Sequence, residues 1–255
     1  MVKYRKHITE MKTMITSSYD DNKLLKFITD YFMIHIAKTN LTDYFNIYFT
    51  NDICNDLTAI SPNVKISIAM DGVTILPTSK EKLITVLINE NVSIEFQIQY
   101  ILHELCHVYD YILFADKYCN GNIFEIRNNK YMKILTTWSE FHVQLFIIPY
   151  YYEIIDFLCN TRSELSSDIR SFFYDAFNER FLTKDKHNDI ATIDIMYYLG
   201  QIAMCNQFDP NHHYSVDERI ILKYPYIQIL NNSLTKCLTF DTFCANLENL
   251  HQLFY

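Results

Sequence analysis

Residues 103–107 read His-Glu-Leu-Cys-His, a spacing that can do metal chemistry. On a helix, His103 and His107 lie one turn apart on the same face, so both imidazoles can reach one metal ion. Glu104, directly after the first histidine, can then reach a water on that metal and is the candidate general base. Zn²⁺ lowers the pKa of such a water towards ~7, which prepares it to attack a carbonyl carbon. The motif therefore predicts a zinc site with a catalytic carboxylate.

The sequence around the motif predicts a helix with two different faces. Asp110 falls on the same face as the two histidines, and six apolar residues fall on the opposite face. These apolar residues are Ile94, Ile98, Ile101, Leu105, Val108 and Ile112. One side of this helix can therefore pack on a core while the other holds a metal. The alternative is a polar face whose histidines hold no metal. We interpret Cys106 as a small filler side chain, although a thiolate there would be a soft ligand.

Catalytic zinc usually takes three protein ligands and a water. The candidate for the third ligand is Glu140, which faces away from an aromatic stripe on the next predicted helix. That position suits a metal ligand and an ordinary solvent-facing glutamate equally well. The rivals are His142 and Asp110. A helix points Glu140 and His142 apart, so we interpret His142 as a packed or supporting histidine. Asp110 is better placed to orient the imidazole of His107 than to bind the metal.

Other polar residues are weaker candidates. His35 lies on the apolar stripe of a predicted N-terminal helix, which is typical of a packed core histidine. His212 and His213 lie in a polar loop and are expected to be exposed. Peptide hydrolysis also needs a group that stabilises an oxyanion. Tyr100 and Tyr111 lie on the appropriate side of the motif helix, but 20 tyrosines leave this role open.

The elements that must position these residues are mainly helices. Before the motif, alternating apolar residues in 64–70, the Asp71-Gly72 pair and the run 73–76 predict a β-hairpin. The apolar run Leu83–Ile88 predicts a buried strand beside the motif helix, where a strand edge can bind an extended peptide. Helices are predicted over Asn22–Lys38, Ile94–Phe114, Met132–Ile148, Glu164–Leu182, Ile190–Gln207 and Phe240–Phe254. The predicted fold class is therefore α+β and predominantly helical.

Composition supports a globular chain and argues against some functions. The chain has 255 residues, 49% hydrophobic, and only 3 Gly and 5 Pro, which favours long helices over a many-turned β fold. A net charge of −8 argues against a nucleic-acid binder. The 7 cysteines form no CxxC pair, which is typical of reduced thiols. Met1–Lys12 lacks a secretory signal, and Glu153 and Asp156 interrupt the apolar run Leu145–Leu158, so we expect a cytoplasmic protein without a membrane span.

The motif residues resemble a known family. His103-Glu104-Leu105-Cys106-His107, followed by Glu140 in a Trp-Ser-Glu-Phe segment, looks like the compact gluzincin pattern. Within that group the chain is most similar to the ImmA/IrrE-type metallopeptidases of bacteria, phages and mobile elements, over about residues 83–146. The resemblance implies a zincin-like core with a small sheet packed on the HExxH helix. It also implies one zinc ion held by His103, His107 and Glu140, and limited cleavage of a regulatory protein such as a repressor.

We therefore predict a zincin-like metallopeptidase core over residues 1–158 and a helical C-terminal extension over 159–255, which can pack together as one domain. The predicted activity is a zinc metalloendopeptidase that uses Glu104 to activate water against a protein or peptide substrate. Histidine and carboxylate ligands also accept manganese, iron or cobalt. One alternative is a catalytically silent, zinc-stabilised protein-binding module, and another is a helical protein without metal. The sequence predicts no oligomeric state.

Overall fold

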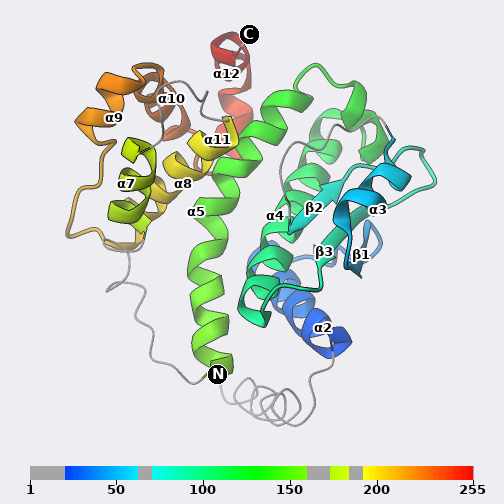
Figure 1. Ribbon diagram of the computed structural model, residues 1–255. Helices are drawn as coiled ribbons and strands as arrows, with labels where there is room; N and C mark the ends of the chain where they lie inside the picture. Colours follow the sequence, from blue (N-terminus) through cyan, green and yellow to red (C-terminus); the bar gives the residue numbers. More distant parts are fainter. Residues whose placement is uncertain (1–20, 63–70, 160–172, 184–191, 255) are drawn as a thin grey trace.

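The computed structural model describes residues 21–62, 71–159, 173–183 and 192–254 (Figure 1). These residues form helices around a small mixed sheet, which confirms the predicted α+β, mainly helical class. The elements before the motif helix are α2 (Asp21–Tyr31), η1 (Phe32–Ala37), β1 (Phe45–Thr50), α3 (Ile53–Ile60), β2 (Gly72–Ile75) and β3 (Ile84–Asn89). The later elements are α4 (Ile94–Tyr118), η2 (Ile123–Asn128), α5 (Met132–Cys159), α7 (Ala176–Thr183), α8 (Thr192–Phe208), α9 (Glu218–Lys223), α10 (Tyr226–Leu234), α11 (Phe240–Ala245) and α12 (Leu247–Phe254).

The sheet has the strand order β1-β3-β2. The predicted buried strand is present as β3, and it is the central strand, parallel to β1 and antiparallel to β2. Both of its edges are therefore already paired, and it cannot offer an edge to a peptide. Within the described part of the chain, the strand with a free edge beside the motif helix is β2. Residues 64–70 of the predicted hairpin lie outside the described residues.

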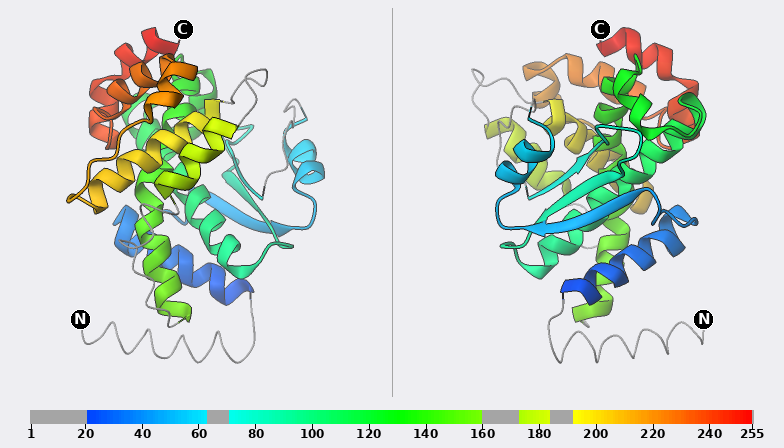
Figure 2. Two further views of the ribbon diagram at one scale, coloured as in Figure 1. Left: turned by 60° about the vertical axis from the view of Figure 1, so that its left-hand side comes forward. Right: turned by 90° about the vertical axis from the view of Figure 1, so that its right-hand side faces the viewer.

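The helices and the sheet form successive layers. The sheet packs on α4, α4 packs on α5, and α5 packs on α8 (Figures 1 and 2). The motif helix α4 has 25 residues and continues four residues beyond the predicted end at Phe114. Helix α5 has 28 residues and continues through Pro149, where the prediction ended it. A proline inside a helix removes one backbone hydrogen bond, but packing on both sides retains the helical path here.

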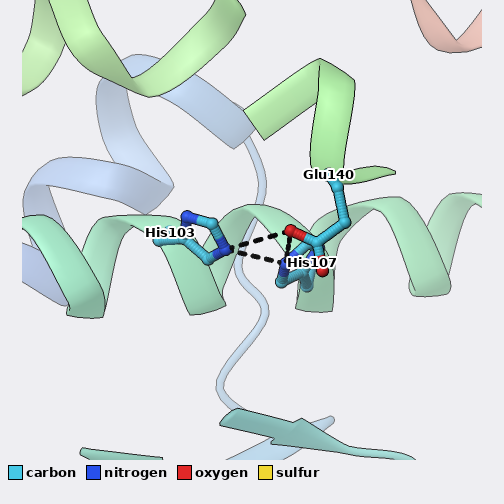
Figure 3. Close-up of side chains that lie close together, drawn as sticks. All are labelled: His103, His107 and Glu140. Carbon is cyan, nitrogen blue, oxygen red and sulfur yellow. Dashed lines mark hydrogen bonds and ion pairs between the residues drawn. The ribbon is translucent and has the colours of Figure 1, made fainter. Parts of the chain in front are cut away.

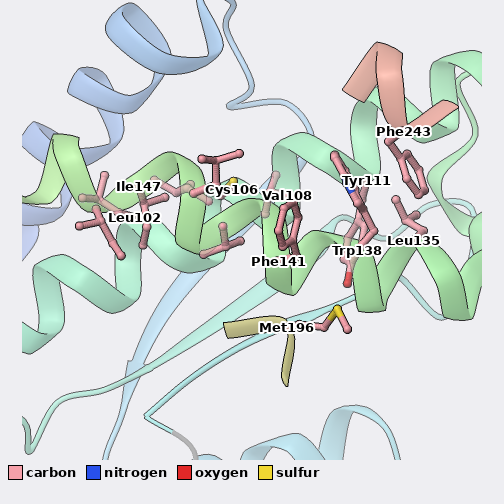
Figure 4. Close-up of a cluster of buried hydrophobic side chains, with 14 of the residues drawn as sticks. Leu102, Cys106, Val108, Tyr111, Leu135, Trp138, Phe141, Ile147, Met196 and Phe243 are labelled. Atoms are coloured by element: carbon pink, nitrogen blue, oxygen red, sulfur yellow. The ribbon is translucent and has the colours of Figure 1, made fainter. Parts of the chain in front are cut away.

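One buried cluster joins these layers. It contains the side chains of Trp138 and Phe141 from α5, Met196 from α8 and Phe243 from α11 (Figure 4). Helix α5 ends at Cys159, at the boundary that we predicted between core and extension, and α8 from the predicted extension packs directly on α5. The division of the chain at residue 158 stays a prediction.

Gly200 lets α5 and α8 approach each other closely. A β-carbon at this position would lie 2.8 Å from Cβ of Gln144, and it would also collide with the backbone carbonyl oxygen of Phe141. Any other residue would push the two helices apart. The glycine therefore sets the distance between the two helices that form one wall of the site.

The remaining helical predictions hold with shifted bounds. α8 corresponds to the predicted helix over 190–207, and the predicted C-terminal helix is two short helices, α11 and α12. The N-terminal half of the predicted helix Glu164–Leu182 lies outside the described residues, and α7 covers its end. None of the described helices combines the length and the apolar character needed to cross a membrane.

Candidate metal centre

Two helices bring the three predicted ligands together. His103 and His107 project from one face of α4, and Glu140 projects towards them from α5 (Figure 3). The two Nε2 atoms lie 3.0 Å apart. The Oε2 atom of Glu140 lies 3.4 Å from Nε2 of His103 and 3.5 Å from Nε2 of His107. Three potential ligand atoms thus form a nearly equilateral triangle.

The size of this triangle fits a tetrahedral zinc ion. With metal–ligand bonds of about 2.0–2.1 Å, two ligand atoms of a tetrahedron stand about 3.3 Å apart. Two imidazole nitrogens and one carboxylate oxygen are also a donor set that catalytic zinc uses. Oε2 of Glu140 is buried, and the two histidine nitrogens stand at the long distances of 3.4 and 3.5 Å from it, which leaves room for a cation between them. The residues therefore fit a zinc ion.

The charges at this point favour a cation. Burial lowers the pKa of His107, but the negative charge of Glu140, a hydrogen bond to it, and the charges of Glu104 and Asp110 together raise that pKa to about 9. Burial raises the pKa of Glu140, but the charge of His107 and the hydrogen bonds to both histidines lower it well below its ordinary value. Without a metal, a proton on His107 neutralises the carboxylate. A divalent cation would take the place of that proton.

A chain of buried polar groups orients His107. Its Nδ1 lies 2.7 Å from Oγ of Ser139, and Ser139 donates to Oδ2 of Asp110 at 2.6 Å. Asp110 is fully buried and also accepts from Nδ1 of His142 at 3.0 Å. Asp110 thus reaches the His107 imidazole, which we expected it to orient, through the hydroxyl of Ser139. Ser139 was not predicted, although it is the polar residue directly before the candidate ligand Glu140.

His142 is part of this support and lies apart from the three ligand atoms. Its ring stacks on Trp138, with centroids 4.5 Å apart, and it is almost completely buried. Cys106 lies near Asp110 and His142, and these three could also surround a metal. However, burial and the charges of Asp110, Glu140 and Glu104 raise the pKa of the Cys106 thiol. Cys106 is completely buried, as a small side chain that fills space in the core would be.

The side chain of Glu104 projects from α4 towards the edge strand β2. Its Oε2 accepts a hydrogen bond from Oγ1 of Thr74 at 2.7 Å, and its side chain is buried. Gly72 makes room for it, because a β-carbon at position 72 would lie 2.9 Å from Oε1 of Glu104. The position of the candidate base is therefore set by contacts with β2.

A cleft of about 740 Å³ opens over these residues. One wall is formed by residues 71–76, which include β2, and the floor by His103, Glu104 and His107 of α4. Glu140 of α5 and Tyr197 of α8 contribute to the opposite wall. Arg127 lines one end and holds the backbone after β2, because its guanidinium donates to the carbonyl oxygens of residues 76 and 77.

Tyr197 is the tyrosine of this cleft that sequence reasoning missed. Its ring packs edge-on against His103, with centroids 5.8 Å apart. Burial, the charges of Glu140 and Glu104, and a hydrogen bond to Glu140 raise its pKa strongly, so the hydroxyl stays a donor. Of the predicted tyrosines, Tyr100 donates to Asp71 at 3.1 Å, and the ring of Tyr111 stacks on that of His107. No local pattern connects Tyr197 with a motif 90 residues earlier.

The remaining histidine candidates lie elsewhere. His35 is partly buried, and its ring lies 4.6 Å from that of Tyr31. His212 and His213 are exposed, and His212 pairs with Asp209 at 2.8 Å. None of the three lines the cleft. No family model, curated protein or solved structure matches this chain, so a functional assignment rests on the site itself.

Proposed function

We propose that this chain is a zinc-dependent metallopeptidase with a zincin-like core. The observation that carries this proposal is the triangle of His103, His107 and Glu140, whose edges match a tetrahedral zinc site. When bound, a zinc ion would supply a Lewis acid that polarises a carbonyl group and brings the pKa of a water to about 7. The chain's own residues supply the other functions.

Glu104 is the proposed general base. Its carboxylate lines the cleft, and the hydrogen bond from Thr74 fixes one oxygen. It takes a proton from the attacking water and returns it to the nitrogen of the leaving amine. Gly72 gives the carboxylate the room to adopt this position.

The edge of β2 is the proposed docking site for the substrate backbone. Unpaired backbone groups on a strand edge bind an extended peptide by strand addition. β2 lies beside α4 and lines the cleft, so a peptide paired with it would pass over the three ligand atoms. The sequence suggests β3 for this role, but both edges of β3 are already paired, so we assign the role to β2.

Tyr197 is the proposed stabiliser of the oxyanion. Peptide hydrolysis places negative charge on the former carbonyl oxygen, and a fixed hydrogen-bond donor in a water-poor site stabilises that charge. The raised pKa of Tyr197 keeps its proton available for this bond. The Ser139–Asp110 pair positions His107, because a proton held on Nδ1 leaves the Nε2 lone pair free for a metal.

Metal content of the purified protein tests the site. Elemental analysis should find about one zinc per chain in the native protein, none in Glu140→Ala, and one in His142→Ala. Glu140→Ala removes a ligand, whereas His142→Ala leaves the three ligands in place and removes a hydrogen bond to Asp110 and the stacking on Trp138. Absence of metal in the native protein, even after zinc is added back, would overturn the proposal.

Turnover is tested separately with Glu104→Gln. This variant should keep its zinc and lose cleavage of peptides, and it can then trap the substrate protein, which we propose is a narrow, regulatory one in the cytoplasm. If native protein holds zinc but Glu104→Gln retains its full biological activity, the chain is a zinc-stabilised binding module. The two measurements together separate metal binding from catalysis.

A further inference from the structure

Two glutamines lie one helical turn beyond residues of the metal centre. Gln144 follows Glu140 by four residues on α5, and Gln201 follows Tyr197 by four residues on α8. Both line the cleft, and their exposed fractions are only 5% and 6%. Gly200 brings their helices together. The two carboxamides therefore form a fixed, buried part of the cleft wall.

The two carboxamides share only one hydrogen bond. Nε2 of Gln201 donates to Oε1 of Gln144 at 3.0 Å. Oε1 of Gln201 is buried and has no hydrogen-bond partner among the described residues. Turning both amides by 180° would reverse this bond and leave an amide N–H of Gln201 open instead. In either orientation the pair keeps one carbonyl oxygen and three N–H groups that are unbonded within the described part of the chain, so it retains both an acceptor and donors for a ligand.

The surroundings of the pair favour an uncharged ligand group. Among the charged residues that line the cleft, Arg180 and Asp194 lie 3.4 Å apart and balance each other's charge, as do Glu140 and the two histidines of α4. Gln144 and Gln201 are themselves neutral. A charged side chain buried against them would lack a counter-charge, whereas a neutral group with a donor and an acceptor would satisfy both open positions.

We propose that Gln144 and Gln201 form a recognition site for a carboxamide side chain of the substrate residue beside the scissile bond. This inference rests on the proposed peptidase function and specifies its substrate. A carboxamide is a neutral side-chain group whose donor and acceptor stand on separate atoms, so it can pair with both open positions at once. One helical turn, about 5.4 Å, separates each glutamine from Glu140 or Tyr197 along its helix, so the pair lies close to the metal centre.

Peptide hydroxamates test the proposal without a known substrate, because the hydroxamate group binds zinc directly. The panel carries one variable side chain beside the hydroxamate: Gln, Asn, Glu, Lys, Leu or Ala. Titration calorimetry on the full-length, zinc-loaded protein measures each affinity. The glutamine compound should bind about 10-fold more tightly than the compounds with leucine or glutamate, since glutamate lacks the donor and leucine lacks both groups.

Two variants assign the preference to the pair. Gln201→Leu should lower the affinity for the glutamine compound about 10-fold and leave the leucine compound unaffected. Gln201→Glu should shift the preference to the lysine compound, because it presents only acceptors and a negative charge. Gln99→Leu is the matched control, since Gln99 also lines the cleft but lies on α4. The Gln99→Leu variant should prefer the glutamine compound as strongly as the native protein does.

Each outcome bears on one proposal. If no compound binds, the alanine compound included, the metal centre and the peptidase proposal fail. If all bind alike, or the leucine compound binds most tightly, the metal centre stands and the carboxamide site is overturned. A glutamine preference that survives in Gln201→Leu also overturns it. The panel on the native protein decides the question even if a variant does not fold.

Discussion

The hydroxyl oxygen of Ser139 lies 2.7 Å from Nδ1 of His107, deep inside the contact between α4 and α5. This bond fixes the orientation of the imidazole, because Ser139 is itself held by the buried carboxylate of Asp110. The charge of Asp110 therefore acts on His107 through a neutral hydroxyl. Residues that orient a metal ligand usually matter almost as much as the ligand.

Ser139→Ala should weaken zinc binding about 10- to 100-fold, because His107 loses the partner that fixes its ring and tautomer. Competition with a chromophoric chelator measures the affinity. Ser233→Ala is the control, since Ser233 bonds only a backbone carbonyl of α10. Equal zinc affinity in the two variants would show that the serine has no part in orienting the histidine.

Tyr197→Phe should keep the zinc and lower kcat about 100- to 1000-fold, because the substitution removes one donor to the oxyanion. The native protein is first incubated with a random peptide library, and mass spectrometry identifies a peptide that it cleaves. The rate of cleavage of that peptide at saturating concentration then gives kcat for each variant. Tyr100→Phe should have a small effect, since its hydroxyl donates to Asp71. A Tyr197→Phe enzyme with native kcat would remove this residue from the mechanism.

Gly72→Ala should reduce peptide cleavage while zinc content stays at the native level. The new methyl group would lie 2.9 Å from Oε1 of Glu104, so the carboxylate has to move away from its bond with Thr74. Val73→Ala, one residue further along β2, is the control for general weakening of the strand. If both variants lose the same activity, displacement of Glu104 is not the cause.

Stability of the metal-free protein should fall as the pH rises from 6.5 to 9. The pKa of His107 is raised from 6.5 to about 9 in the folded protein, so protonation favours the folded state. This stabilisation is complete below pH 6.5 and is lost as the pH passes 9. The carboxyl of Glu140 has a lowered pKa, so its contribution is present above pH 4.5 and is lost in acid.

Urea unfolding of chelator-treated protein at several pH values measures this effect. The Glu140→Gln variant serves as the comparison, because it lacks the charge that raises the pKa of His107. Its midpoint should change less between pH 6.5 and 9 than that of the native chain. If the midpoints of both proteins change with pH in the same way, the pH dependence does not come from the pair of His107 and Glu140.

The residues predicted best from sequence are those that share one helix. The four-residue spacing of His103 and His107 placed them on one face of α4, because helical geometry is local. The assignment of Glu140 as the third ligand required a helical-wheel projection of a second helix as well as a family resemblance. The strand β1, Phe45–Thr50, was missed, although its alternating burial is the ordinary sign of a strand on a sheet with one covered face.

Features that depend on contacts between distant segments could not be predicted. Tyr197 and Gln201 reach the cleft because α8 packs on α5, and no periodicity within α8 indicates that partner. The position of β3 in the centre of the sheet follows from pairing with β1 and β2, which its own apolar run does not reveal. The serine before Glu140 becomes meaningful only when α4 and α5 are side by side.

Gly200→Ala should destabilise the protein by about 1–3 kcal/mol, because a methyl group would overlap Phe141 and Gln144 across the helix contact. Thermal unfolding measures this change. Ala203→Gly, one turn further along α8, is the control: it loses about 1 kcal/mol of helix propensity without crowding the contact. If Gly200→Ala stabilises the protein, α5 and α8 are further apart at this point than the structure has them.

The same glycine shows that local and global preferences conflict in α8. Alanine would form a better isolated helix by about 1 kcal/mol, yet only glycine allows the approach that brings α8 to the cleft. Such local frustration is expected where function, and not folding, selects a residue. The two histidines of α4 and the glutamate of α5 do not depend on it. Loosening of α8 alone would therefore leave the triangle of His103, His107 and Glu140 in place and withdraw Tyr197 and Gln201 from the cleft, so one helix contact separates the two halves of the proposed site.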